Sequence, residues 1–200
     1  MVDVLVVCTA NVCRSPMAQG FLAAELAARH VEATVHSAGT ALGPERPPAG
    51  AVAAMAAWGI DTSGHRARPL EDRLLEEADL VLGMARAHVR EAVVRLPAVF
   101  SKAFTLKELV RRAGAVEPRR PEEPVDAWLA RVGRGRGRQV LVGRSDDDDV
   151  ADPIGGPPAA YRATAGELHD LVVTLCDLAW PRAWPRVTWP RVTWPRASET

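Results

Sequence analysis

Residues 1–16 constrain the fold most, because they combine the features of a buried strand with those of a helix start. Val2 to Val7 is an apolar, largely β-branched run in which Asp3 is the only polar residue. Such a run is typical of a strand that is covered on both faces of a parallel sheet. Ser15 is suited to the N-cap of a helix and Pro16 to its first turn. The sequence therefore predicts a tight connection, residues 8–14, between a central strand and a helix N-terminus.

This connection, the Cys8–Arg14 loop, carries a cysteine and an arginine separated by five residues. A loop that enters a helix directs several backbone N–H groups at one point, where the helix dipole adds positive potential. An oxyanion bound there would lie over the Cys8 sulfur, and the same donors would favour the nucleophilic thiolate. The planar guanidinium of Arg14 can bind two of the anion's oxygens at once. Taken alone, a cysteine that ends a core strand usually serves packing, but the flanking residues favour an anion site.

Farther along the chain, strands and helices alternate, which indicates an α/β protein. Strands are predicted at residues 31–36, 78–84 and 98–104, and helices at residues 17–30, 49–58, 86–95, 105–113, 121–132 and 157–179. Residues 133–150 are rich in Gly, Arg and Asp and are predicted to form a solvated loop. Residues 180–196 repeat Trp-Pro-Arg four times, and we expect the segment 180–200 to be a disordered tail. Anchoring of the tail to a membrane or partner through Trp and Arg is the alternative.

Composition narrows the possible partners and the compartment. Lys+Arg and Asp+Glu both number 25, so there is no basic excess that would indicate nucleic-acid binding. No apolar run approaches the length of a membrane helix, and Val4 to Val7 is too short for a signal peptide. The three cysteines cannot form a disulfide framework, and their odd number favours a reducing compartment. We therefore expect a cytoplasmic protein.

Residues 7–16, Val-Cys-Thr-Ala-Asn-Val-Cys-Arg-Ser-Pro, resemble the signature of the low-molecular-weight protein-tyrosine phosphatases. The likeness continues, in family order, in Ser37-Ala38-Gly39-Thr40, in residues 64–68 and 78–84, and in Asp152-Pro153. It covers residues 1–95 and 150–179, whereas residues 95–150 are longer than usual and divergent. The low lysine content and abundant alanine suggest a bacterial member.

The resemblance implies a single domain over residues 1–179: a doubly wound, four-stranded parallel sheet with helices on both faces, and no metal or cofactor. Cys8 would attack phosphorus to form a cysteinyl-phosphate, with Arg14 binding the phosphate and Asp152 acting as general acid and then base. The phosphate-binding positions would be Thr9, Ala10, Asn11, Val12, Cys13, Arg14 and Ser15. Residues that support the loop would be Asn11, Ser15, Ser37 and His65. Phosphotyrosine proteins or small phosphomonoesters would be the substrates.

The Asp152 assignment depends on its context. An Asp-Pro followed by two glycines would by itself indicate only a turn. Pro153 keeps Asp152 out of helical geometry, on a loop that could reach across a cleft. Asp146 to Asp149 offer competing carboxylates, but a run of like charges is typical of a solvated loop. In the family, the second loop cysteine, here Cys13, can form a disulfide with the nucleophile and protect it from over-oxidation.

The match is incomplete where the family usually places cleft aromatics. The corresponding stretches read Ala41-Leu42-Gly43-Pro44 and Ile154-Gly155-Gly156, and Tyr161 is the only tyrosine. Leu42 and Ile154 could supply an apolar wall instead, and Ala85 replaces a usual Asp. Val12 favours phosphotyrosine, since phosphoarginine phosphatases of the family carry threonine there. Two alternatives stay open: an arsenate reductase that uses a small-molecule thiol, and an inactive phosphate-binding module.

Overall fold

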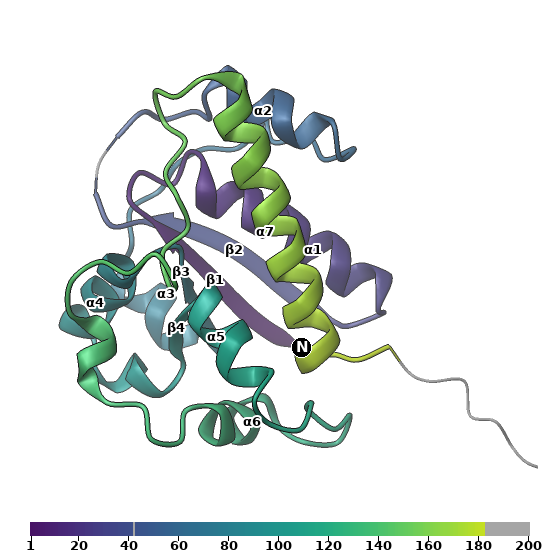
Figure 1. Ribbon diagram of the computed structural model, residues 1–200, viewed down its shortest axis with the longest axis vertical. Helices are drawn as coiled ribbons and strands as arrows, with labels where there is room; N and C mark the ends of the chain where they lie inside the picture. Colours follow the sequence, from purple (N-terminus) through teal and green to yellow (C-terminus); the bar gives the residue numbers. More distant parts are fainter. Residues whose placement is uncertain (42, 183–200) are drawn as a thin grey trace, which may run out of the picture.

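A computed structural model describes residues 1–41 and 43–182 (Figure 1). In chain order, the elements are β1 (Val2–Cys8), α1 (Arg14–Ala28), β2 (Ala33–Gly39), α2 (Ala49–Ala56), α3 (Asp72–Glu77), β3 (Leu80–Gly83), α4 (Arg86–Arg95), the 3-10 helix η1 (Pro97–Ser101), β4 (Ala103–Thr105), α5 (Leu106–Ala113), α6 (Val125–Val132), the 3-10 helix η2 (Arg138–Leu141) and α7 (Pro158–Ala179).

The four strands form one parallel sheet in the order β2-β1-β3-β4. Alternate residues of β1 face opposite sides of this sheet. Val4 and Val6 pack with apolar residues of α1, α2, α5, α6 and α7, whereas Leu5 and Val7 pack with those of α3 and α4. Figure 1 shows α1 and α7 side by side over one face of the sheet, with α4 on the other side. The sheet is therefore doubly wound, as expected, and the fold belongs to the α/β class.

The chain after β1 and the chain after β3 leave the sheet toward opposite faces. Parallel α/β sheets form a crevice at the carboxyl ends of the two strands where such a reversal occurs, and ligands bind in it. Here Cys8 ends β1 and Met84 directly follows β3, and the Met84 N–H donates to the Val7 carbonyl over 2.9 Å. The Cys8–Arg14 loop therefore lies at the switch point of the sheet.

The strand predicted at residues 2–7 is confirmed, and Val4, Leu5, Val6 and Val7 are completely buried. Other boundaries differ. The second strand begins at Ala33, and most of the segment 98–104 is the 3-10 helix η1, which starts at Pro97, so β4 has only three residues. Helix α3 was not predicted, because its six residues are too few to show a helical period.

The segment 133–150 is only partly the solvated loop that its composition predicts: many of its residues are exposed, but it also contains η2 and two buried charges. Arg136 lies over the rings of Phe100 and Phe104, with centroid distances of 4.4 and 4.2 Å, and forms an ion pair with Glu108. Both side chains of this pair are only 2% exposed. Asp148 is also buried, with 1% of its side chain exposed. A sequence pattern cannot show that these charges meet partners from other elements.

At the end of α7, Trp180 is 4% exposed and belongs to the core, although it begins the repeat segment. The expectations for Leu42 and for residues 183–200 of the tail lie outside the described residues. Within residues 1–41 and 43–182, no helix has both the length and the apolar character needed to cross a membrane.

Candidate active site

The Cys8–Arg14 loop joins the carboxyl end of β1 to the first turn of α1. The Cys8 side chain is buried, and its Sγ accepts a hydrogen bond from the Ser15 hydroxyl over 3.0 Å. The prediction that Ser15 is the N-cap of α1 is wrong, because the helix already begins at Arg14 and its N-cap is Cys13. No side chain of the described residues caps this helix. Its first N–H groups therefore have the arrangement that binds an anion at a helix N-terminus.

Asn11 holds the loop in shape from its centre. It has a left-handed backbone, with φ of 53°, which asparagine tolerates better than most residues. Its Nδ2 donates to the hydroxyls of Ser15 over 2.9 Å and Ser37 over 2.7 Å, and its Oδ1 accepts from the Arg68 N–H over 3.1 Å. Nε2 of His65 lies 2.7 Å from the Asn11 carbonyl oxygen. The structure thus brings together all four residues expected to support the loop and adds Arg68.

Gly39, the last residue of β2, and His65 both lie against this loop. A Cβ atom at Gly39 would lie 2.7 Å from the Thr9 carbonyl oxygen, so the close approach of the two chains requires glycine. Burial lowers the pKa of His65, so the ring that contacts the Asn11 carbonyl is neutral at neutral pH and can donate from Nε2. The Cys8–Arg14 loop is therefore packed closely against the end of β2 and contacts His65.

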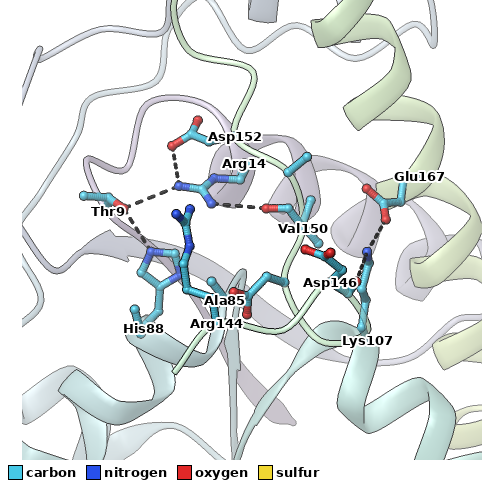
Figure 2. Close-up of a pocket in the computed structure, with 13 residues that line it drawn as sticks. Thr9, Arg14, Ala85, His88, Lys107, Arg144, Asp146, Val150, Asp152 and Glu167 are labelled. Carbon is cyan, nitrogen blue, oxygen red and sulfur yellow. Dashed lines mark hydrogen bonds and ion pairs between the residues drawn. The ribbon is translucent and has the colours of Figure 1, made fainter. Parts of the chain in front are cut away.

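On the other side of the loop, Arg14 is 7% exposed and has three partners (Figure 2). Its Nη1 donates to the Val150 carbonyl over 3.2 Å, and its Nη2 donates to the Thr9 hydroxyl over 3.4 Å and to Asp152 Oδ2 over 2.6 Å. Asp152 lies 138 residues from Arg14 in the chain, and 42% of its side chain is exposed. Its Oδ1 also accepts from the Ile154 N–H over 3.2 Å. The predicted anion-binding guanidinium and the predicted acid are therefore in direct contact.

His88 is a neighbour of this group that the sequence did not reveal. Its Nε2 lies 3.0 Å from the Thr9 hydroxyl, and the side chain is 4% exposed. Burial, assisted by the positive charge of Arg14, lowers the pKa of His88 to about 3. The imidazole is therefore neutral near pH 7, and it adds no positive charge beside Arg14.

Cys13 differs from Cys8 in its surroundings. It is 1% exposed, and burial, with smaller effects of the Asp152 and Cys8 charges, raises its pKa to about 12. The Cys13 thiol therefore stays protonated at neutral pH and is not a competing nucleophile. All three cysteines of the chain are free and buried.

A cavity of about 760 Å³ opens beside Arg14 and Asp152. Its lining comes from the Cys8–Arg14 loop, the start of α4, residues 144–152, and an ion pair between Lys107 and Glu167 at the far end (Figure 2). Among the described residues that line it, none is Phe, Tyr or Trp. Tyr161 is 6% exposed, and its hydroxyl accepts from the Gly155 N–H over 3.3 Å. Ile154 is 50% exposed.

Comparisons with known proteins agree with this geometry. Residues 3–124 match the family model of the low molecular weight phosphotyrosine protein phosphatases. A probable low molecular weight protein-tyrosine-phosphatase of Ralstonia solanacearum, EpsP, is 37% identical over 142 residues, which cover 64% of this chain and 94% of the relative. The protein-arginine-phosphatase of Bacillus subtilis is 29% identical over 171 residues, 85% of this chain and 91% of the relative.

Among solved structures, the low molecular weight protein tyrosine phosphatase from T. tengcongensis superposes with a TM-score of 0.67. It is 34% identical, and the match covers 88% of this chain and 99% of that one. The parallel α/β sheet with a cysteine at the end of its first strand agrees with the family match, and that match gives the class as phosphatase. The chain belongs to the low molecular weight phosphotyrosine protein phosphatase family.

Proposed function

We propose that this protein hydrolyses phosphotyrosine in proteins through a cysteinyl-phosphate on Cys8. The observation that carries the proposal is the contact of Arg14 with Asp152 beside the loop in which Ser15 donates to the Cys8 sulfur. A nucleophile, an anion-binding group and an acid from distant parts of the chain are the three components that phosphate-ester cleavage through a covalent intermediate needs.

Substrate binding begins with an exchange of partners at Arg14. The phosphate dianion occupies the N–H groups of the Cys8–Arg14 loop and takes the guanidinium N–H groups that Asp152 uses in the free protein. This exchange frees the Asp152 carboxyl and leaves it at the mouth of the loop, on the side of the leaving oxygen. Asp152 then carries the proton that the leaving group needs.

In the first chemical step, the Cys8 thiolate attacks phosphorus in line with the leaving oxygen. The S–P bond forms, the P–O bond breaks, and the Asp152 proton passes to the departing phenolate oxygen. In the second step, the Asp152 carboxylate takes a proton from water as the water oxygen attacks phosphorus. The S–P bond breaks, and the Ser15 hydroxyl, 3.0 Å from Sγ, stabilises the departing thiolate.

The preference for tyrosine over arginine rests on Val12. This residue is 1% exposed, and its methyl groups offer no hydrogen bond to the N–H groups of a phosphoarginine. The tyrosine ring would lie against apolar groups such as Ile154, which is half exposed beside Asp152. Small aryl phosphomonoesters share the phosphate and the aromatic leaving group, and they are expected to be substrates as well.

The proposal is tested with three substrates: a phosphotyrosine peptide, a matched phosphoarginine peptide and p-nitrophenyl phosphate. We expect wild-type protein to cleave the first and third and Cys8→Ser to cleave none. Cys176→Ser is the matched control, because Cys176 is also buried but lies in α7, away from the loop. Equal turnover by wild type and Cys8→Ser would refute the mechanism, and preference for phosphoarginine would refute the substrate. Arsenate-dependent thiol consumption without ester hydrolysis would indicate a reductase.

A further inference from the structure

Of the acidic run Asp146 to Asp149 that precedes Asp152, Asp148 is buried against neighbouring elements and Asp149 is partly buried. Asp148 Oδ2 accepts from Arg86 Nε and Nη2 over 2.8 and 2.6 Å, and its Oδ1 accepts from Arg111 over 2.6 Å. The Asp148 side chain is 1% exposed. Burial alone would raise the pKa of Asp148, but the hydrogen bonds from Arg111 and Arg86 outweigh it and lower the pKa. Asp148 therefore remains a carboxylate that binds α4 and α5.

The next two residues fasten the same segment to the sheet. Asp149 Oδ1 accepts from the Arg86 N–H over 2.7 Å, at the first residue of α4, where a negative charge is favoured by the helix dipole. The Val150 N–H donates to the Met84 carbonyl over 2.8 Å, directly after β3. Residues 148–150 are thus attached to β3, α4 and α5 by side-chain and backbone bonds.

This attachment ends where the candidate site begins. The Val150 carbonyl accepts from Arg14 Nη1 over 3.2 Å, and Asp152, two residues later, accepts from Arg14 Nη2. After Asp152, Pro153 is buried and the Ile154 N–H donates to Asp152 Oδ1, but Ile154 itself is half exposed and Gly155 has a positive φ of 78°. The buried bonds of residues 148–150, on the N-terminal side of Asp152, therefore help to determine where its carboxyl lies.

We propose that Asp148 and Asp149, held by Arg86, are positioning residues that place Asp152 for proton transfer to the leaving group. This inference rests on the proposed function, because it assumes that Asp152 is the acid. A displacement of about 1 Å at a catalytic group can reduce a rate by about 100-fold. Loss of the attachment should therefore weaken acid catalysis, and it should do so most for esters whose leaving group needs a proton.

The test compares kcat/KM for phenyl phosphate, a poor leaving group, with that for p-nitrophenyl phosphate, a good one. We expect Asp148→Asn to reduce the phenyl phosphate value by about 10- to 100-fold and the other value much less. Glu108→Gln is the matched control, because Glu108 is another buried carboxylate, and it pairs with Arg136 and Arg112 rather than with residues 148–152. It should lower thermal stability and leave the ratio of the two kcat/KM values unchanged.

A double variant separates positioning from a general loss of structure. If Asp148 acts through Asp152, then Asp148→Asn has almost no further effect on the ratio in an Asp152→Asn background. The inference would be overturned if Asp148→Asn changed the ratio by the same factor in both backgrounds, or if it lowered kcat/KM equally for both esters. If Asp148→Asn does not fold, Asp149→Ala, which spares the buried ion pairs, carries the same expectation.

Failure of the proposed function gives a different result. If Asp152→Asn itself leaves the ratio of the two kcat/KM values unchanged, Asp152 is not the acid and both proposals fall. If Asp152→Asn changes the ratio while Asp148→Asn and Asp149→Ala behave like Glu108→Gln, only the positioning role is overturned.

Discussion

Replacement of Asp152 by asparagine should improve anion binding while it impairs turnover. In the free protein, Asp152 Oδ2 lies 2.6 Å from Arg14 Nη2, so a phosphate must displace this ion pair to use the guanidinium. The neutral amide of the variant cannot compete as a charged group and does not repel a dianion. The two effects of one substitution therefore have opposite signs, which a simple loss of structure would not produce.

The size of the binding effect follows from the exposure of the pair. The Arg14 side chain is 8% exposed but that of Asp152 is 42% exposed, so solvent screens the interaction strongly. Pairs of this kind contribute about 0.2–1 kcal/mol. Asp152→Asn should therefore bind inorganic phosphate up to about fivefold more tightly. Loss of the acid should lower kcat/KM for phenyl phosphate by about 100- to 10,000-fold.

The assay is the inhibition constant of inorganic phosphate against p-nitrophenyl phosphate turnover. Asp146→Asn serves as the control, because Asp146 lines the same cavity and its carboxylate makes no contact with Arg14 in the described part of the chain. If phosphate binds Asp152→Asn no more tightly than wild type, the ion pair does not compete with the substrate. If Asp146→Asn gained as much affinity for phosphate as Asp152→Asn, the effect would come from the overall electrostatic potential of the cavity.

Three further predictions concern groups around the loop. Because the pKa of His88 falls to about 3 on folding, the unfolded chain binds an extra proton below the ordinary value of 6.5. The free energy of unfolding should thus decrease as pH falls from about 6.5 towards 3, by about 1.4 kcal/mol per pH unit. In urea titrations of His88→Asn over this range, the free energy of unfolding should depend less steeply on pH, by the equivalent of one proton. The same pH dependence as in wild type would contradict this. Peroxide should oxidise Cys8 to a sulfenic acid, which condenses with the Cys13 thiol to a disulfide and releases water. Mass spectrometry should detect this bridge and thiols should reverse it; Cys8 sulfinic acid without the bridge would defeat the expectation. Ser37→Ala leaves a buried Asn11 donor without one partner, so it should cost about 1–3 kcal/mol in urea unfolding and weaken phosphate binding; unaltered stability and affinity would show that Ser37 does not support the loop.

The parts of the fold that the sequence predicted well are those in which local pattern and tertiary packing agree. Val2 to Val7 is apolar because it is buried on both faces, and the chain from Pro158 to Ala179 shows its buried face at helical spacing. Thr105 is the N-cap of α5, and its hydroxyl accepts from the Glu108 N–H over 3.0 Å. Such features depend on neighbours in the chain and can therefore be read locally.

The parts that the sequence could not reveal depend on partners far away in the chain. The run Asp146 to Asp149 has the composition of a solvated loop, but Arg86 and Arg111 neutralise Asp148 in the interior. Arg136 likewise lies in a segment with the composition of a flexible basic loop, and its side chain is buried because it pairs with Glu108 and lies over the rings of Phe100 and Phe104. A charged residue is buried when its partner is present, and the partner's position is a property of the fold.

The central claim is that Cys8 forms a covalent bond to phosphorus, and acid quenching of wild-type protein during p-nitrophenyl phosphate turnover tests it most directly. Mass spectrometry of the proteolysed sample should find one phosphoryl group on the peptide that contains Cys8. The Asp152→Asn variant should show the same adduct, because its cysteine and Arg14 are intact, and Cys8→Ser should show no turnover. Turnover without any phosphoryl group on the Cys8 peptide, together with sustained hydrolysis by Cys8→Ser, would contradict the account.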